Sequence, residues 1–87
     1  MNIICMYDAE SKKCIKFQKL LKRYLYPIQK SVFQGTLTPA QFKRLKAELK
    51  DLSSPKDSVY LFYTYNDKDL YSEEIGKKQK NRRIIID

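Results

Sequence analysis

Short apolar runs and two helical stripes make up the hydrophobic pattern of this chain. The first run, residues 2–7, is bounded by Asp8, which predicts a short buried strand. At residues 59–65 both faces are apolar or aromatic, as expected for a central strand rather than an edge strand. Shorter apolar segments follow at residues 70–75 and 83–86, and the charged stretch between them is predicted to be a linker.

Two other stretches show the spacing of amphipathic helices. In residues 11–25 the apolar side chains share one face and the lysines share the other, with Ile15 alone out of place, and Pro27 ends the helix. The second helix begins at a capping box, residues 38–41, in which Thr38 is the N-cap and a proline takes the first helical position. Its apolar stripe consists of Phe42, Leu45, Leu49 and Leu52.

The segment between the helices is β-rich. Residues 28–37 form either one bent strand or a tight hairpin that turns near Lys30 and Ser31. In chain order the elements are then β-α-β-β-α-β followed by one or two short strands, which is the ferredoxin-like pattern of the α+β class. We divide the chain into a ferredoxin-like core at residues 1–66 and a C-terminal extension at residues 67–87.

The predicted sheet has one face that its own helices do not reach. Two helices on one face leave the other face in need of cover. The isoleucines at 84–86 follow a charged linker at residues 76–81, and they would supply this cover by crossing to a second copy of the chain. A chain of 87 residues also leaves much of its surface unburied as a monomer. Both arguments predict a homodimer.

Charge is unevenly spread along the chain. The formal net charge is +8, and residues 12–50 hold eleven Lys or Arg and one acid, whereas seven bases balance seven acids in residues 51–87. Such a field suits nucleic acid or an anionic membrane surface. A lysine-dominated surface follows a phosphate backbone and reads few bases, and the alternative is an ordinary solvated helix face. The candidate contacts are Lys12, Lys13, Lys16, Lys19, Lys22, Arg23 and Lys30.

The residue types of the chain exclude several chemistries. Histidine is absent, which removes the commonest general base and excludes Ser-His and Cys-His triads. Cys5 and Cys14 fit no CxxC pattern, and we expect small buried hydrophobes without a disulfide, in a reducing compartment. The apolar run at residues 2–7 is too short for a signal-peptide core and no segment reaches the length of a membrane span. We therefore expect a cytoplasmic protein with no membrane partner.

Asp8 is the candidate for chemistry, because it is a lone carboxylate at the tip of a buried strand in a basic chain. A hard divalent cation takes about six oxygen ligands. Water and substrate phosphate, or Asp8 of a second copy, must therefore complete its shell. The alternative is that Asp8 forms an ordinary turn before the helix. Glu10 is either a second ligand or an acid that the helix dipole favours.

Three residues near Asp8 are supporting candidates. Tyr7 either orients a phosphate through its hydroxyl or belongs to the core. Ser31 is a candidate donor to phosphate, and Phe33 is a candidate platform for a base. The alternative for both Ser31 and Phe33 is a purely structural role.

The order and spacing of several short strings carry a resemblance to a known family. They are Tyr7-Asp8 at the end of the first strand, residues 29–35 (Gln-Lys-Ser-Val-Phe-Gln-Gly) and residues 37–41 at the start of the second helix, with further support at residues 56–59 and 73–77. On these strings, which span essentially the whole chain, the sequence resembles the second CRISPR-associated protein, the small subunit of the CRISPR adaptation module that partners the integrase.

The resemblance implies a homodimer of ferredoxin-like protomers whose C-terminal strands pack onto one another, with the strand-end aspartates at the dimer axis. It also implies a magnesium-dependent endonuclease, usually of single-stranded RNA and sometimes of double-stranded DNA, that holds new spacer DNA between integrase dimers. By position, Asp8 matches the family's metal-binding, catalytic carboxylate, so that one Mg²⁺ would be shared at the axis. The chain departs from the family at Gln34, where Glu is frequent, and in the first helix, where lysines stand in place of arginines.

The sequence therefore predicts a cytoplasmic homodimer that binds RNA or DNA, partners the integrase subunit and acts as a Mg²⁺-dependent endoribonuclease. A rival interpretation is a non-catalytic scaffold, in which charge and shape hold DNA while the integrase does the chemistry. A third is a toxin-like ribonuclease of the same fold, which would need no integrase.

Overall fold

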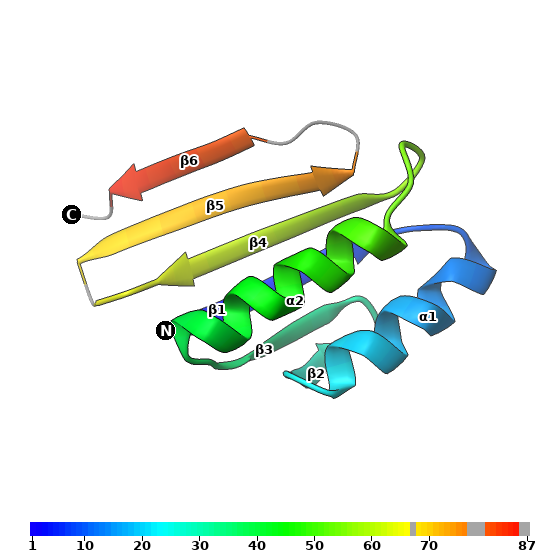
Figure 1. The fold of residues 1–87 in the computed structure, drawn as a ribbon, viewed down its shortest axis with the longest axis horizontal. Helices are drawn as coiled ribbons and strands as arrows, with labels where there is room; N and C mark the ends of the chain where they lie inside the picture. The colour runs from blue at the N-terminus through cyan, green and yellow to red at the C-terminus, as the bar shows by residue number, and fades with distance from the viewer. Residues whose placement is uncertain (67, 77–79, 86–87) are drawn as a thin grey trace.

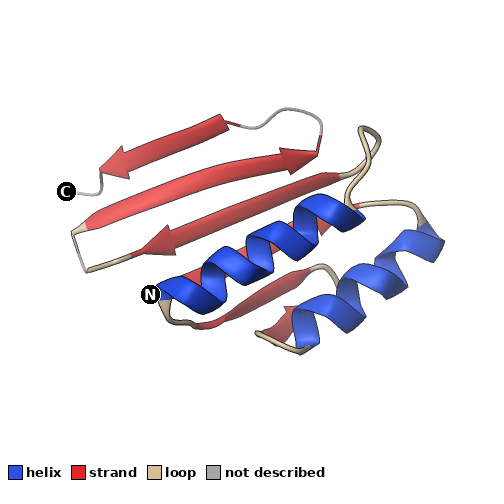
Figure 2. Ribbon diagram, in the orientation of Figure 1, coloured by secondary structure: helices blue, strands red, loops and turns tan. Residues whose placement is uncertain are grey.

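The structure, a computed structural model, describes residues 1–66, 68–76 and 80–85, and in these it forms one antiparallel sheet with two helices on one face (Figure 1). In Figure 2 the two helices lie in front of the strands, on the side of the viewer. The elements are, in chain order, β1 (Asn2–Asp8), α1 (Ser11–Lys22), β2 (Tyr26–Gln29), β3 (Val32–Thr36), α2 (Pro39–Leu52), β4 (Ser58–Thr64), β5 (Asp69–Gly76) and β6 (Lys80–Ile85).

The strands lie in the order β2-β3-β1-β4-β5-β6, and every neighbouring pair is antiparallel. The first four strands with their two helices form the ferredoxin-like βαββαβ unit, which confirms the predicted α+β class. β4 lies between β1 and β5, so the prediction of a central strand is also confirmed. Of the two alternatives for the segment after α1, the hairpin is correct, because β2 and β3 pair around a turn at Lys30 and Ser31.

Helix α1 is shorter than the spacing predicts. It ends at Lys22 rather than near residue 25, because the amides of Arg23 and Tyr24 donate to carbonyls three residues back and tighten the chain into a turn. This turn directs Leu25 into the core and starts β2 at the next residue. Pro27 therefore lies inside β2, an edge strand, where a missing amide donor is tolerated.

The core lies between the helices and the sheet. Every second residue of β1 and β4 faces the helices, and the predicted apolar stripes of α1 and α2 face the sheet. Ile15 is 56% exposed, as the helical wheel predicts, and Leu52 is only partly buried. The main buried side chains are Ile3, Cys5, Tyr7, Phe17, Leu20, Leu21, Phe33, Phe42, Leu45, Leu49, Val59, Leu61, Tyr63 and Ile75.

In the described part of the chain, no helix lies on the opposite face of the sheet, which we call the open face (Figure 1). It carries the alternate side chains of β1 and β4, such as Ile4, Met6, Tyr60 and Phe62. Ile4 is 42% exposed and Tyr60 is 38% exposed. The prediction that one sheet face is left without a helical cover is therefore confirmed for the single chain.

The C-terminal strands extend the ferredoxin-like unit at one edge. β5 pairs along β4 and contributes Ile75 to the core, and β6 pairs along β5. The predicted linker at residues 76–81 is too long, because β5 continues to Gly76 and β6 begins at Lys80. Residues 77–79 of the linker and Ile86 of the isoleucine run lie outside the described residues. Crossing of β6 to a second copy and the division at residue 66 stay predictions.

Among the described residues, no helix has both the length and the apolar composition that crossing a bilayer requires.

Candidate functional site

Asp8 is the last residue of β1 and is exposed. Since Ile3, Cys5 and Tyr7 face the core, alternation along the strand gives Asp8 to the open face. In the sheet it stands opposite Ser58, the first residue of β4. The carboxylate therefore lies at one end of the sheet, where a ligand can reach it from solvent.

The residue before Asp8 is anchored in the core. The Tyr7 amide donates to the carbonyl oxygen of Ser31 at 3.1 Å, and its hydroxyl donates to the carbonyl oxygen of Lys30 at 3.0 Å. Its ring stacks on Phe17, with 5.1 Å between ring centroids. Burial raises the pKa of Tyr7, although a hydrogen bond with Gln18 opposes this. The hydroxyl is therefore committed to the β2–β3 turn.

Burial decides between the alternatives for two supporting candidates. Tyr7 is 5% exposed and Phe33 is 1% exposed, and their rings stack on one another with centroids 6.4 Å apart. A ring that stacks on a nucleobase must offer a free face. The structure therefore favours the core alternative for both residues, and the hypotheses that Tyr7 orients a phosphate and that Phe33 stacks on a base are not supported. Ser31 is half-buried in the turn beside them.

The residues after Asp8 are held by helix α1. The Cys14 thiol donates to the carbonyl oxygen of Ala9 at 3.1 Å. Glu10 is the N-cap of α1, and its carbonyl oxygen accepts the amides of Lys13 and Cys14 at 2.8 and 2.9 Å. Cys5 lies beneath in the core, where burial raises the pKa of its thiol to about 12. Asp8 is therefore flanked on both sides by backbone in fixed positions.

The donor set at Asp8 suits magnesium. In the ranges that the structure describes, no three Cys, Asp or Glu side chains converge as a metal cage. Mg²⁺ keeps several of its waters and is usually bound through one or two carboxylates together with substrate phosphate. One exposed carboxylate per chain fits such an ion, and Asp8 is the residue that would hold it. Glu10, the other acid beside the strand end, is also exposed.

The predicted cations differ in their surroundings. Lys13 is half-buried and its ammonium forms an ion pair with Asp57 at 3.1 Å, so this charge is already matched within the chain. Arg23 pairs with Glu48 at 2.9 Å and its guanidinium lies 5.5 Å from the centroid of the Tyr24 ring. The other members of the predicted set are exposed, and they are Lys12, Lys16, Lys19, Lys22 and Lys30.

Asp57 is a residue that sequence reasoning missed. It is 2% exposed, and its Oδ2 accepts hydrogen bonds from the Ser54 amide at 2.9 Å and the Ser54 hydroxyl at 3.1 Å, besides the ion pair with Lys13. Burial by itself would raise the pKa of Asp57, but these donors outweigh it and hold the pKa below its ordinary value. The serine three residues earlier is the signal that was available.

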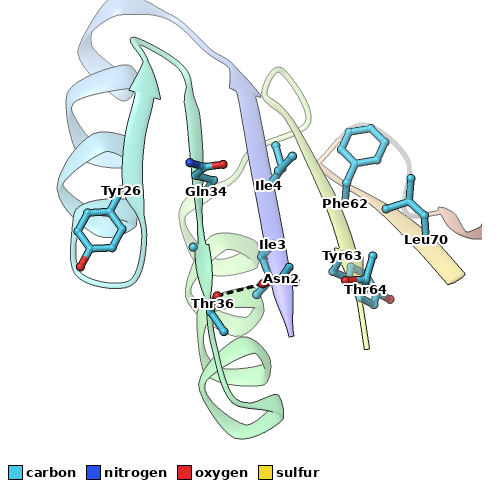
Figure 3. Close-up of a pocket in the computed structure, with 11 residues that line it drawn as sticks. Asn2, Ile3, Ile4, Tyr26, Gln34, Thr36, Phe62, Tyr63, Thr64 and Leu70 are labelled. Carbon is cyan, nitrogen blue, oxygen red and sulfur yellow. Dashed lines mark hydrogen bonds between the residues drawn. The ribbon is translucent and has the colours of Figure 1, made fainter. Parts of the chain in front are cut away.

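The open face also contains a shallow hollow of about 550 Å³, away from Asp8 (Figure 3). Figure 3 shows Ile4 of β1 and Phe62 of β4 on neighbouring strands, with Leu70 of β5 beyond them. At one end the Thr36 hydroxyl donates to the side-chain oxygen of Asn2 at 3.0 Å. An apolar hollow in the middle of a sheet face is suited to packing against another apolar surface.

Comparison with known sequences identifies the family. The family described as CRISPR associated protein Cas2 matches residues 1–72. This chain belongs to the Cas2 family. The CRISPR-associated endoribonuclease Cas2 of Methanosarcina acetivorans is 32% identical over 87 residues, which cover 99% of this chain and 100% of that protein. The protein of the same name from Haloferax volcanii is 39% identical over 62 residues, 71% of this chain and 72% of the relative.

Solved Cas2 structures have the same fold. A crystal structure of Streptococcus pyogenes Cas2 at pH 6.5 superposes with a TM-score of 0.69 at 26% identity, over 77% of this chain and 89% of the other. A second crystal structure of Cas2 gives a TM-score of 0.67 at 39% identity, over 70% of each chain. The family resemblance predicted from the sequence is therefore confirmed, and the matched residues of this Cas2 protein include Asp8 and all of α1.

Proposed function

We propose that this Cas2 protein is a CRISPR adaptation nuclease that hydrolyses phosphodiester bonds in single-stranded RNA, with Mg²⁺ held by Asp8. The supporting observation is the position of Asp8, an exposed carboxylate at the end of β1 on the open face. Relatives that align over most of the chain are named endoribonucleases. Double-stranded DNA is a second substrate to be tested in the same assay.

The proposed enzyme is a homodimer that associates through the open face. This face exposes Ile4 and Tyr60, which a second copy would cover. Because Asp8 belongs to the same face, a twofold axis through the end of the sheet would bring the two Asp8 side chains towards one another. Two carboxylates would then share one ion, with water and substrate phosphate completing its shell.

The residues of the chain have distinct roles in this mechanism. A bound Mg²⁺ would offset negative charge on the phosphate and favour ionisation of an attacking water. The anchoring of Tyr7 and Ala9 on either side of Asp8 keeps its backbone in position before substrate arrives. The exposed lysines of α1 attract the phosphate backbone. Since the chain has no His, a rise of the cleavage rate with pH cannot come from an imidazole.

Replacement of Asp8 by Asn tests the proposal. We expect the Mg²⁺-dependent cleavage rate to fall by more than the roughly 10- to 100-fold that is typical of residues which only support a metal ligand. RNA binding should persist, because the lysines of α1 are unchanged. Glu10→Gln, at the exposed acid two residues further on, tests the alternative for that residue: cleavage should be retained if Glu10 only suits the helix dipole, and should fall if Glu10 is a second ligand. If the purified wild-type protein cleaves neither RNA nor DNA with Mg²⁺ at any pH tested, the proposal is wrong.

The exposed cations of α1 favour a second function, a non-catalytic scaffold that binds the nucleic-acid backbone while an integrase subunit does the chemistry. On this hypothesis the wild-type protein binds duplex DNA with a steep dependence on salt, co-purifies with the integrase and supports spacer capture. Asp8→Asn should then leave all three properties unchanged. Loss of spacer capture in that variant would contradict the scaffold hypothesis.

A further inference from the structure

At the end of the sheet that carries Asp8, β1, β4 and β5 lie side by side. Asp8 of β1 pairs with Ser58 of β4, and Ser58 pairs on its other side with Gly76 of β5. The residue directly before Ser58 is Asp57, which is 2% exposed. A buried carboxylate therefore lies next to the strand that lines Asp8.

The carboxylate of Asp57 joins two separate elements. Its Oδ2 accepts the amide and the hydroxyl of Ser54, in the loop between α2 and β4, at 2.9 and 3.1 Å. The same oxygen forms the 3.1 Å ion pair with Lys13, which lies in the first turn of α1. Displacing a buried carboxylate from its donors leaves an uncompensated charge in the interior. The contact between α1 and the loop is therefore hard to open.

These contacts close a ring around residues 8–10. From Asp8 the chain runs into α1, where Lys13 reaches across to Asp57. One residue further on, Ser58 pairs with Asp8 and completes the ring. Within it, the carbonyl oxygens of residues 9 and 10 accept donors from α1. A segment fixed at both ends has few alternative conformations, and this applies to the backbone that carries Asp8.

We propose that Lys13 and Asp57 are positioning residues that hold Asp8 in the orientation needed to bind a divalent cation. The inference rests on the proposed function and adds to it a means by which the site is held in place. It also separates Lys13 from its neighbour Lys12, although both were predicted to contact nucleic acid. Lys12 is exposed and serves the phosphate backbone, whereas Lys13 serves the carboxylate site.

The backbone of Asp57 is packed as tightly as its side chain. Gly76 has φ 107°, a conformation that favours glycine, and a Cβ there would collide with the carbonyl oxygen of Asp57. The strand that follows Asp57 is thus confined between β1 and β5. This close contact restricts movement of the Asp57 backbone.

Three variants test the proposal. Lys13→Met breaks the ion pair, Lys13→Arg keeps it, and Lys12→Met is the matched control on an exposed neighbour. Each is studied at a temperature at which thermal unfolding shows it to be fully folded. The readouts are hydrogen exchange of the amides at residues 8–10 without metal, the affinity for Mn²⁺ as a probe of the cation site, and the salt dependence of single-stranded RNA binding.

We expect Lys13→Met to speed amide exchange at residues 8–10 and to weaken Mn²⁺ binding about 10-fold or more, as for other residues that support a metal ligand. The salt dependence of RNA binding should be unchanged in this variant. Lys12→Met should leave exchange and Mn²⁺ binding at wild-type values and lower the log–log salt slope by about 0.7. Lys13→Arg should restore both exchange and Mn²⁺ affinity.

The proposed function and the positioning role of Lys13 would be contradicted by different results. If the wild-type protein binds no Mn²⁺, the proposed function is wrong, and exchange at residues 8–10 alone decides whether Lys13 orders this segment. If Lys13→Met keeps wild-type exchange and Mn²⁺ affinity, or lowers the salt slope as Lys12→Met does, the positioning role is wrong. The double variant Lys13→Met with Asp57→Asn removes both charges, and recovery of stability without recovery of Mn²⁺ affinity would support positioning over a purely structural role.

Discussion

Two carboxylates at the same end of the sheet have opposite surroundings. Asp8 is exposed on the open face, whereas Asp57 is 2% exposed and is held by Ser54 and Lys13. The Oδ2 atom of Asp57 already accepts three protein donors and has little capacity left for a ligand, whereas the exposed carboxylate of Asp8 can exchange its water for one. At the scale of single residues, these surroundings favour Asp8 over Asp57 as the proposed ligand of a metal ion.

Asp57 should make the stability of the fold sensitive to acid. Its pKa is lowered in the folded state, so its contribution is complete above the ordinary Asp pKa of about 4 and is lost as the pH falls through the lowered value. In Asp57→Asn, we expect the deficit in the free energy of unfolding to be large at pH 7 and smaller at pH 3. Urea titrations at the two pH values measure it.

The exposed acid Asp51 of α2 provides the control for this experiment. Asp51→Asn should change the free energy of unfolding little, because this side chain is exposed. A deficit in Asp57→Asn that is the same at pH 3 and pH 7 would contradict the assigned role of the ionised carboxylate.

The sequence locates Asp8 but cannot separate Lys12 from Lys13. Asp8 is visible because a polar residue ends a short apolar run, and this is a local pattern. Lys12 and Lys13 are adjacent residues of the same type, and what distinguishes them is a carboxylate contributed by a distant loop. Burial of Asp57 is equally a product of tertiary packing. Single-residue roles that depend on such partners therefore require the structure.

At the scale of elements, the start of α2 could be predicted from the sequence, whereas the end of α1 could not. Thr38 and Gln41 form the predicted capping box, because all of its atoms come from four consecutive residues. The end of α1 at Lys22 was not predicted, because it is set by the need to bring Leu25 into the core and to start β2. Local chemistry fixes the first boundary, and packing fixes the second.

Removal of the cap should destabilise the fold. In the native protein the Thr38 hydroxyl accepts the Gln41 amide at 3.1 Å, and the Gln41 side chain accepts the Thr38 amide at 2.9 Å. We expect Thr38→Ala to cost about 1 kcal/mol, which lowers Tm by roughly 4–8 °C in a domain of this size. Thr38→Ser retains the oxygen and should stay near the wild-type Tm. Equal melting temperatures for the two variants would contradict the role of the cap.

Helix α1 should determine the salt dependence of nucleic-acid binding. Lys16 and Lys19 are exposed on its outer side, and each phosphate contact contributes about 0.9 to the log–log salt slope on duplex DNA. We expect Lys16→Gln and Lys19→Gln each to reduce the slope by about this amount, measured by fluorescence anisotropy over a range of salt concentrations. Lys68→Gln, an exposed lysine between β4 and β5, is the control and should leave the slope unchanged.

At the scale of the whole molecule, the two faces of the sheet differ in what covers them. One face holds the core beneath α1 and α2, and the cations of α1 lie on the outside of this layer. The open face exposes Ile4 and Tyr60 and bears Asp8 at its end. Amphipathic spacing was sufficient to predict this layering, because it depends on which side of each element is apolar. The extension of the sheet by β5 and β6 was harder to predict from the sequence, because the charged residues near Gly76 resemble a linker.

Association through the open face is open to a direct test. We expect the wild-type protein to have the mass of a dimer in light scattering at micromolar concentration. Ile4→Lys, which places a charge on the open face, should shift the mass to that of a monomer. Ile15→Lys is the matched control, because Ile15 is more exposed but lies on the outer side of α1. A wild-type monomer, or equal effects of the two substitutions, would exclude the open face as the interface.

Pro27 has a consequence for growth of the sheet into larger assemblies. In the described part of the chain the outermost strands of the sheet are β2 and β6, and Pro27 of β2 has no backbone amide to donate to a further strand. Repeated joining of β2 of one copy to β6 of the next, which would build an endless ribbon, is thereby disfavoured. Joining of two β6 edges by a twofold axis ends after a single step. We therefore expect Pro27 to disfavour the edge-to-edge growth of this small basic protein into fibres.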